Sequence, residues 1–160
     1  MNEGQRDASG LIAAGLSAMR AGSGALREAD IAIAVKPTPA SNARWFVRMF
    51  VLPRRTKDSV KPVELFWSSL EQARDQFDSC DTMLSRAFSI HGDIAAVAAL
   101  QAELGAAGYE HIRPALHAHV VSGAEADGSL VLQPAVARMR LCEARMLAAI
   151  QALATNDSRT

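Results

Sequence analysis

The histidines of the central region, His111, His117 and His119, with His91 upstream, are the residues with the clearest capacity to hold a metal. A metal site on one helix usually spaces its ligands three or four residues apart, so that they share a face. Here the spacings are six and two. On a helix of 3.6 residues per turn, His117 and His119 point about 200° apart. We therefore interpret these histidines as surface residues near a kink and predict no bound metal and no cofactor, with metal binding as the alternative.

The two cysteines, Cys80 and Cys142, are the candidates for nucleophilic chemistry. Each falls at an apolar position of a helical repeat, where a thiol behaves as a small hydrophobic side chain with a raised pKa. The sequence has no G-x-S-x-G turn to hold a catalytic serine. The acids Asp75, Asp78 and Asp81 stand three apart, which a solvated helix flank explains better than acid–base catalysis. These patterns predict a protein that is not an enzyme.

One short stretch combines aromatic, aliphatic and cationic side chains. The run Trp45–Leu52 is apolar almost all round, and Pro53 and several basic residues follow it. From Lys36 to Lys61, seven Lys/Arg stand against the single Asp58, a local charge of +6, which leaves −6 for the rest of a chain of zero net charge. The residues that we expect to meet a partner are Trp45, Phe46, Arg48, Met49, Phe50, Arg54, Arg55 and Lys57.

This basic aromatic segment (residues 43–61) has two interpretations. In the first it is a short buried helix whose arginines extend their charged groups to the surface. In the second its apolar side chains enter an apolar surface while the cations meet anionic head groups or an acidic protein. Nucleic-acid binding is the least favoured interpretation, because the positive charge is confined to one stretch.

The elements around these residues are predicted to be helices, because mainly apolar residues recur at alternating spacings of four and three residues along three long stretches. The first, about 9–35, carries Ile12, Leu16, Met19, Ser23, Leu26, Asp30 and Ile33. The second, about 62–88, carries Phe66, Leu70, Ala73, Phe77, Cys80, Leu84 and Ala87. The third, which Pro134 is expected to open, carries Ala135, Met139, Cys142, Met146, Ala149 and Leu153. Shorter helices are expected after a cap at Asp93 and from Gly108 to Val121, the latter interrupted by Pro114.

We predict one all-α domain, an antiparallel helical bundle of two long helices plus shorter ones, with disordered termini. The chain of 160 residues is 49% hydrophobic, which suffices for one core. The domain is expected to span residues 9–155, between a disordered tail at 1–8 and a frayed tail at 156–160. Within it we expect a linker at 36–42 and a flexible loop at 122–130.

The first residues lack the apolar core of a signal peptide, and no run reaches the roughly 18 apolar residues of a membrane span. The two cysteines lie far apart in the sequence. Such cysteine usage is typical of a reducing compartment. We therefore expect a soluble, cytoplasmic protein.

The central region carries an ordered set of residues: Leu84-x-Arg86-Ala87, Asp93, Val97, Leu100-Gln101-x-Glu103-Leu104 and Tyr109-Glu110, with Trp67 and Phe77 upstream. In these residues it resembles the central region of the phasins, which coat polyhydroxyalkanoate storage granules. The resemblance covers about residues 60–120, and the basic aromatic segment is not part of the family pattern. It implies a non-enzymatic coat protein, often oligomeric, whose amphipathic helices lie on a hydrophobic polyester granule. The alternative function is a helical adaptor that docks on a protein partner or an anionic membrane through residues 44–57.

Overall fold

The computed structural model describes residues 3–34, 62–122 and 128–155. Within these ranges the predicted all-α bundle is confirmed, and no helix there is both long and apolar enough to cross a membrane. Its elements are α1 (Glu3–Ala34), α3 (Pro62–His91), α4 (Ala95–Ala106), the 3₁₀ turn η1 (Tyr109–His111), α5 (Ile112–Ser122) and α6 (Gly128–Thr155).

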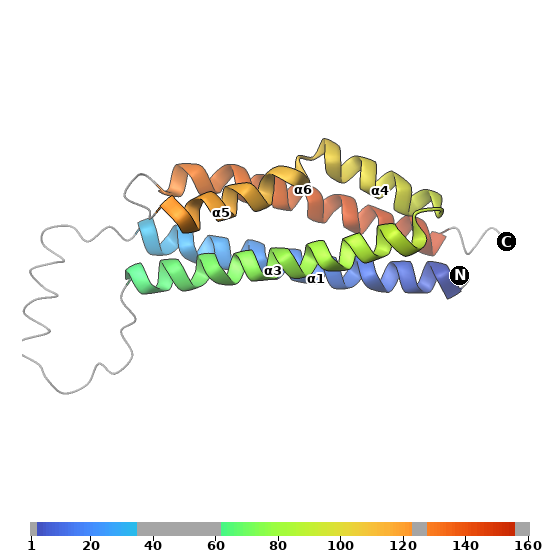
Figure 1. The fold of residues 1–160 in the computed structure, drawn as a ribbon, viewed down its shortest axis with the longest axis horizontal. Helices are drawn as coiled ribbons and strands as arrows, with labels where there is room; N and C mark the ends of the chain where they lie inside the picture. The colour runs from blue at the N-terminus through green and yellow to red at the C-terminus, as the bar shows by residue number, and fades with distance from the viewer. Residues whose placement is uncertain (1–2, 35–61, 123–127, 156–160) are drawn as a thin grey trace, which may run out of the picture.

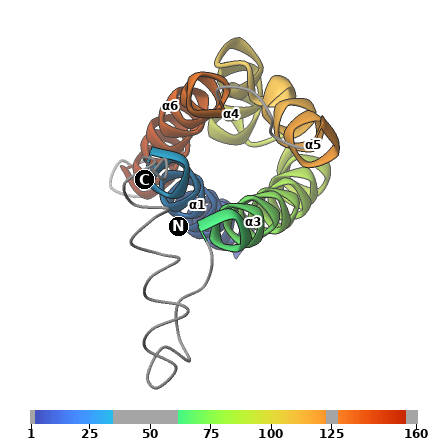
Figure 2. The same cartoon turned by 90° about the vertical axis from the view of Figure 1, so that its left-hand side faces the viewer.

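The helices form an up-down-up-down bundle whose neighbours are antiparallel (Figure 1). Helix α1 lies beside α3, and α4 and α5 follow one another along the third edge before α6 returns beside α1. Viewed along the bundle, the elements close a ring in the order α1, α3, α5 with α4, and α6 (Figure 2). Together α4 and α5 therefore take the place of the third helix in a four-helix bundle.

The inward faces are those that the residue spacing predicts. Of the three predicted repeats, every side chain whose burial the structure describes is buried, apart from the half-buried Asp30. Phe77 is the largest of the fully buried side chains and lies near the middle of α3. The 3.6-residue period of a helix is a local property, so the pattern along one segment suffices to identify its buried stripe.

Small residues let α1 and α3 approach closely. A Cβ atom added at Gly22 would lie 3.3 Å from the Ala73 carbonyl oxygen and 3.1 Å from Met139 Cε. One added at Gly15 would lie 3.4 Å from Leu84 Cγ. A larger side chain at Gly22 would therefore require Ala73 on α3 and Met139 on α6 to shift. The small buried residues of α1 on this side recur every seven positions, at Ala8, Gly15, Gly22 and Ala29.

The third edge of the bundle is broken between α4 and α5. Gly108 has φ of 76°, a left-handed conformation that favours glycine, and its amide donates to the Gly105 carbonyl at 3.0 Å. The Tyr109 ring then packs against Phe77, with centroids 5.1 Å apart. Pro114 does not interrupt a helix as predicted: it lies in the first turn of α5, where its missing N–H needs no partner.

Several predicted boundaries differ from those of the structure. Helix α1 begins at Glu3, so residues 3–8 are helical where the spacing predicted a tail, and Ala8 is fully buried. Helix α6 begins at Gly128 and contains Pro134, which therefore does not open it. The cap of α4 is Ile94, without a side-chain hydrogen bond, instead of Asp93.

The linker at 36–42, the tail at 156–160 and the middle of the predicted loop, residues 123–127, lie outside the described residues. The basic aromatic segment lies outside them as well. Statements about these segments therefore stay predictions.

Candidate functional site

The residues predicted to meet a partner, Trp45 to Lys57, lie outside the part of the chain that the structure describes. What is described is where the chain leaves and re-enters the bundle. Ala34 ends α1 and Pro62 begins α3, and both lie at the same end of the bundle (Figure 1).

The three histidines whose side chains the structure describes, His91, His111 and His117, form no metal site. His91 Nε2 lies 2.8 Å from Asp7 Oδ2 and links the end of α3 to the start of α1. His111 and His117 are exposed, and the side chain of His119 is outside the described set. Among the residues of known placement, no group of three or more His, Cys, Asp or Glu could hold a metal ion. His91 therefore has a packing role that its position in the sequence does not indicate.

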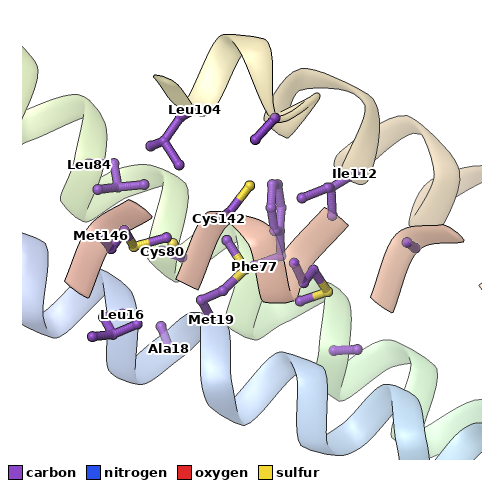
Figure 3. Close-up of a cluster of buried hydrophobic side chains, with 14 of the residues drawn as sticks. Leu16, Ala18, Met19, Phe77, Cys80, Leu84, Leu104, Ile112, Cys142 and Met146 are labelled. Atoms are coloured by element: carbon purple, nitrogen blue, oxygen red, sulfur yellow. The ribbon is translucent and has the colours of Figure 1, made fainter. Parts of the chain in front are cut away.

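Both thiols lie in the core, as their place in the repeats predicts. Cys80 on α3 and Cys142 on α6 are fully buried and free (Figure 3). Burial raises the pKa of Cys80 to about 12 and that of Cys142 to about 11. Because nucleophilic and metal-binding cysteines act as thiolates, these protonated thiols serve as small apolar side chains at neutral pH.

The acids of α3 do more than face water, which the sequence pattern did not indicate. Arg113 Nε of α5 lies 3.1 Å from Asp78 Oδ1, and the Tyr109 hydroxyl donates to Asp81 Oδ1 at 3.2 Å. Burial is the main cause that raises the pKa of the Tyr109 hydroxyl. These contacts fasten η1 and α5 to α3.

A groove of about 630 Å³ lies beside these contacts, between α3 and α5. Its two arginines are already held by carboxylates, because Arg74 Nη2 lies 3.1 Å from Asp75 Oδ1 and Arg113 contacts Asp78. The groove therefore presents paired charges instead of a field of one sign. It is lined by Arg74, Asp75, Asp78, Arg113, Pro114 and His117.

The seam between α1 and α6 carries polar groups among its apolar ones. Ser23 is 2% exposed, and its hydroxyl donates to Glu143 Oε1 at 2.6 Å. Arg20 Nε lies 3.9 Å from the other oxygen of that carboxylate. About two turns further along α1, Asp30 has a buried Oδ1 with no hydrogen bond among the described residues. Polar groups of this kind weaken a seam compared with aliphatic side chains.

By chain order the helices group into two antiparallel hairpins, which pack together along this seam and along the one between α3 and α5. One is α1 with α3, and the other is α4 and α5 with α6. Gly92, Asp93 and Ile94 connect them. The inner faces of the two hairpins, packed together in Figure 3, form the largest continuous apolar surface of the described chain. This interior is the candidate site, and it is accessible only if the hairpins separate.

Comparison of the chain with protein-family models, with curated proteins and with solved structures found no match.

Proposed function

We propose that this protein is a non-enzymatic helical coat protein that binds the hydrophobic surface of a polyester storage granule through the inner faces of its helices. The observation that supports it most directly is the sorting of side chains on the long helices. The large apolar residues gather on inward stripes, while the outward positions of α3 carry mainly charged and polar residues. Such helices are stable in water as a closed bundle and can lie on an apolar surface when the bundle opens.

Opening follows the seams between the two hairpins. The Ser23–Glu143 contact places a carboxylate within the α1/α6 seam. The three-residue connection after His91 acts as the hinge, and α1 and α3 stay together. At roughly 25 cal/mol per Å² of apolar surface removed from water, contact over a few hundred Å² suffices to hold the open form on the granule.

A disulfide between the two hairpins tests this proposal. In the Ser23→Cys/Glu143→Cys variant, one new thiol stands on each side of the α1/α6 seam, at two positions whose side chains meet in the wild-type protein. Wild-type protein and the reduced variant are expected to sediment with amorphous polyhydroxybutyrate particles, and the oxidised variant to bind at least about tenfold more weakly, about 1.4 kcal/mol. The reduced variant is the matched control, and mass analysis after alkylation establishes which thiols are bonded.

Two outcomes contradict the proposal. Wild-type protein that stays in the supernatant removes the granule as the target. An oxidised variant that binds as well as the reduced one shows that the hairpins need not separate. A fluorescent fusion that stays diffuse in polymer-accumulating cells would point the same way as the first outcome.

The second candidate function is an adaptor that docks on an acidic protein or an anionic membrane through residues 44–57. The local charge of +6 beside an aromatic run supports it. Here Trp45→Glu/Phe50→Glu is expected to abolish binding to vesicles of anionic lipid, while circular dichroism stays helical. The two candidates are distinguishable, because the disulfide lock leaves this contact intact and the double substitution leaves the bundle interior intact.

A further inference from the structure

The core of the bundle contains sulfur atoms contributed by three helices. Two belong to the free thiols of Cys80 and Cys142, and the others are methionine thioethers. All of them are fully buried, and aliphatic side chains and the Phe77 ring surround them (Figure 3). The buried sulfur residues of the described chain are Met19 of α1, Cys80 of α3, and Met139, Cys142 and Met146 of α6.

Four of these side chains lie in one part of the core (Figure 3). Cys142 and Met146 are four residues apart on α6, so they share a face of that helix. Helix α3 lies across the ring from α6 (Figure 2), so Cys80 and Cys142 enter the interior from opposite sides. Burial is the largest cause of the raised pKa of Cys80, and the charge of Cys142 adds to it, which requires the two thiols to be near each other. We define the sulfur cluster as Met19, Cys80, Cys142 and Met146.

The sulfur cluster offers the ligands that Cu(I) prefers. Thiolate and thioether sulfur are soft ligands and favour a soft, singly charged ion. Structural zinc and iron–sulfur clusters are usually held by four Cys or His ligands, whereas this chain has two cysteines in all. Cu(II) and the hard divalent ions prefer nitrogen and oxygen, which no member of the sulfur cluster supplies.

We propose that the sulfur cluster binds one Cu(I) ion. The ion would replace the proton of one thiol, the proton would leave to solvent, and no oxidation state would change. The thioethers and the other thiol coordinate as neutral ligands. The exchange of one proton for one Cu(I) therefore adds no net charge to an apolar core, where an added charge would be costly.

Protonation of the metal-free thiols lowers the affinity of the sulfur cluster without preventing binding. Burial raises the pKa of both thiols, so at neutral pH the ion has to displace a proton. The same burial excludes the water ligands that would favour Cu(II). The affinity is therefore expected to rise with pH, because less work is then needed to remove the proton.

A bound ion would connect the two hairpins of the bundle. Met19 and Cys80 belong to one hairpin, and Cys142 and Met146 belong to the other. Cu(I) is therefore expected to stabilise the closed bundle. The proposal does not depend on granule binding, because the sulfur cluster is complete in the closed form.

Anaerobic titration of the full chain with the Cu(I) complex of bicinchoninate tests the site. Wild-type protein is expected to withdraw about one equivalent of Cu(I) from this chelator. Cys80→Ala/Cys142→Ala should withdraw none, because it removes both thiols that the chain contains.

Thioether variants separate a site in the core from binding by a thiol alone. Met19→Leu/Met146→Leu keeps both thiols and nearly the same core volume, and it is expected to bind Cu(I) about tenfold more weakly, about 1.4 kcal/mol. Met83→Leu is the matched control at a half-buried position of α3 outside the sulfur cluster, and it should bind like wild type.

Urea unfolding with and without Cu(I) shows which state of the chain holds the ion. Copper in the folded core raises the midpoint of wild-type protein and leaves that of Cys80→Ala/Cys142→Ala unchanged. Four results would each overturn the proposal: no uptake of Cu(I), uptake that lowers the midpoint, equal affinity in Met19→Leu/Met146→Leu, or stoichiometric binding of Zn(II) by the same residues.

Discussion

Helix α1 takes part in two seams that are built from different residues. Against α3 it presents Gly15 and Gly22, whose missing side chains bring the Leu84 side chain and the Ala73 carbonyl within van der Waals contact. Against α6 it presents Ser23, which hydrogen-bonds to Glu143. The first seam is close-packed at the two glycines, and its charged contact, His91 with Asp7, lies at the end of α3. The second carries the Glu143 carboxylate beside the buried Ser23. One helix can therefore hold one neighbour firmly and release another.

The other neighbour of α3 is the edge formed by α4 and α5, which is interrupted where α1 is one continuous helix. Between α4 and α5 the chain turns at Gly108, and the fragments are held by Leu100, Leu104, Ile112 and Leu116 together with exposed ion pairs to α3. Short helices lose less of their packing than long ones when they shift, and exposed ion pairs contribute little. The difference between the α1/α3 hairpin and the rest of the bundle is therefore expected to appear in stability measurements.

The largest expected effect is on the unfolding free energy, when one leucine is truncated in α3 and, in a separate variant, one in α5. Leu84 and Leu116 are the same residue type and each is 1% exposed. Leu84→Ala is expected to cost about 3–4 kcal/mol of unfolding free energy and Leu116→Ala about 2 kcal/mol, because short α5 can settle into the cavity and α3 cannot. Urea denaturation measures both, and equal losses would show that the two regions are packed alike.

A valine at Gly22 tests the close approach of α1 and α3. The new side chain would enter space already occupied by Met139 and the Ala73 carbonyl, and overpacking of this kind costs about 2 kcal/mol. Gly24→Val is the control, since nothing lies within 4 Å of a Cβ there, and it should change the unfolding free energy by less than about 0.5 kcal/mol. If Gly22→Val is as stable as wild type, the seam is not tight.

The buried thiols predict how stability depends on alkaline pH. In the folded chain the pKa values of Cys80 and Cys142 are about 12 and about 11, above the ordinary value of 9.0. The unfolded chain therefore loses these protons first, and the unfolding free energy should fall as pH rises from about 9, by about 1 kcal/mol for each thiol near pH 10. Cys80→Ala and Cys142→Ala should each flatten this fall, and an unchanged slope would mean that the thiols are not buried.

Native-state labelling of the same thiols gives the smallest expected effect. Cys142 lies on α6, and the Cys80 thiol of α3 lies 4.0 Å from the Tyr109 hydroxyl of the other hairpin, so separation of the hairpins would uncover both thiols. Cys80 and Cys142 are therefore expected to react with iodoacetamide at rates within about twofold of each other, once each rate is divided by that of the unfolded chain. Peptide mapping by mass spectrometry gives both rates, and labelling of one thiol alone would show that the bundle opens elsewhere.

Local patterns predicted the buried faces of the bundle correctly, and contacts between distant residues account for what they missed. The repeats of α3 and α6 identified Phe77, Cys80 and Cys142 as inward, because helical periodicity needs no partner. The early start of α1 was missed because Asp7 meets His91, which is 84 residues away. The ion pairs of α3 with Arg113 were missed for the same reason.

The sequence by itself determined that this protein is helical, where its long helices run and which stripe each one buries, since these follow from spacing along the chain. The tertiary structure decided which helices are neighbours. It placed α3 against the glycines of α1, and it placed Glu143 of α6 against Ser23 of α1. It also decided that the outer side of α4 stays exposed beside Leu141. Packing between segments far apart in sequence sets these features, and no local propensity encodes which segment will arrive.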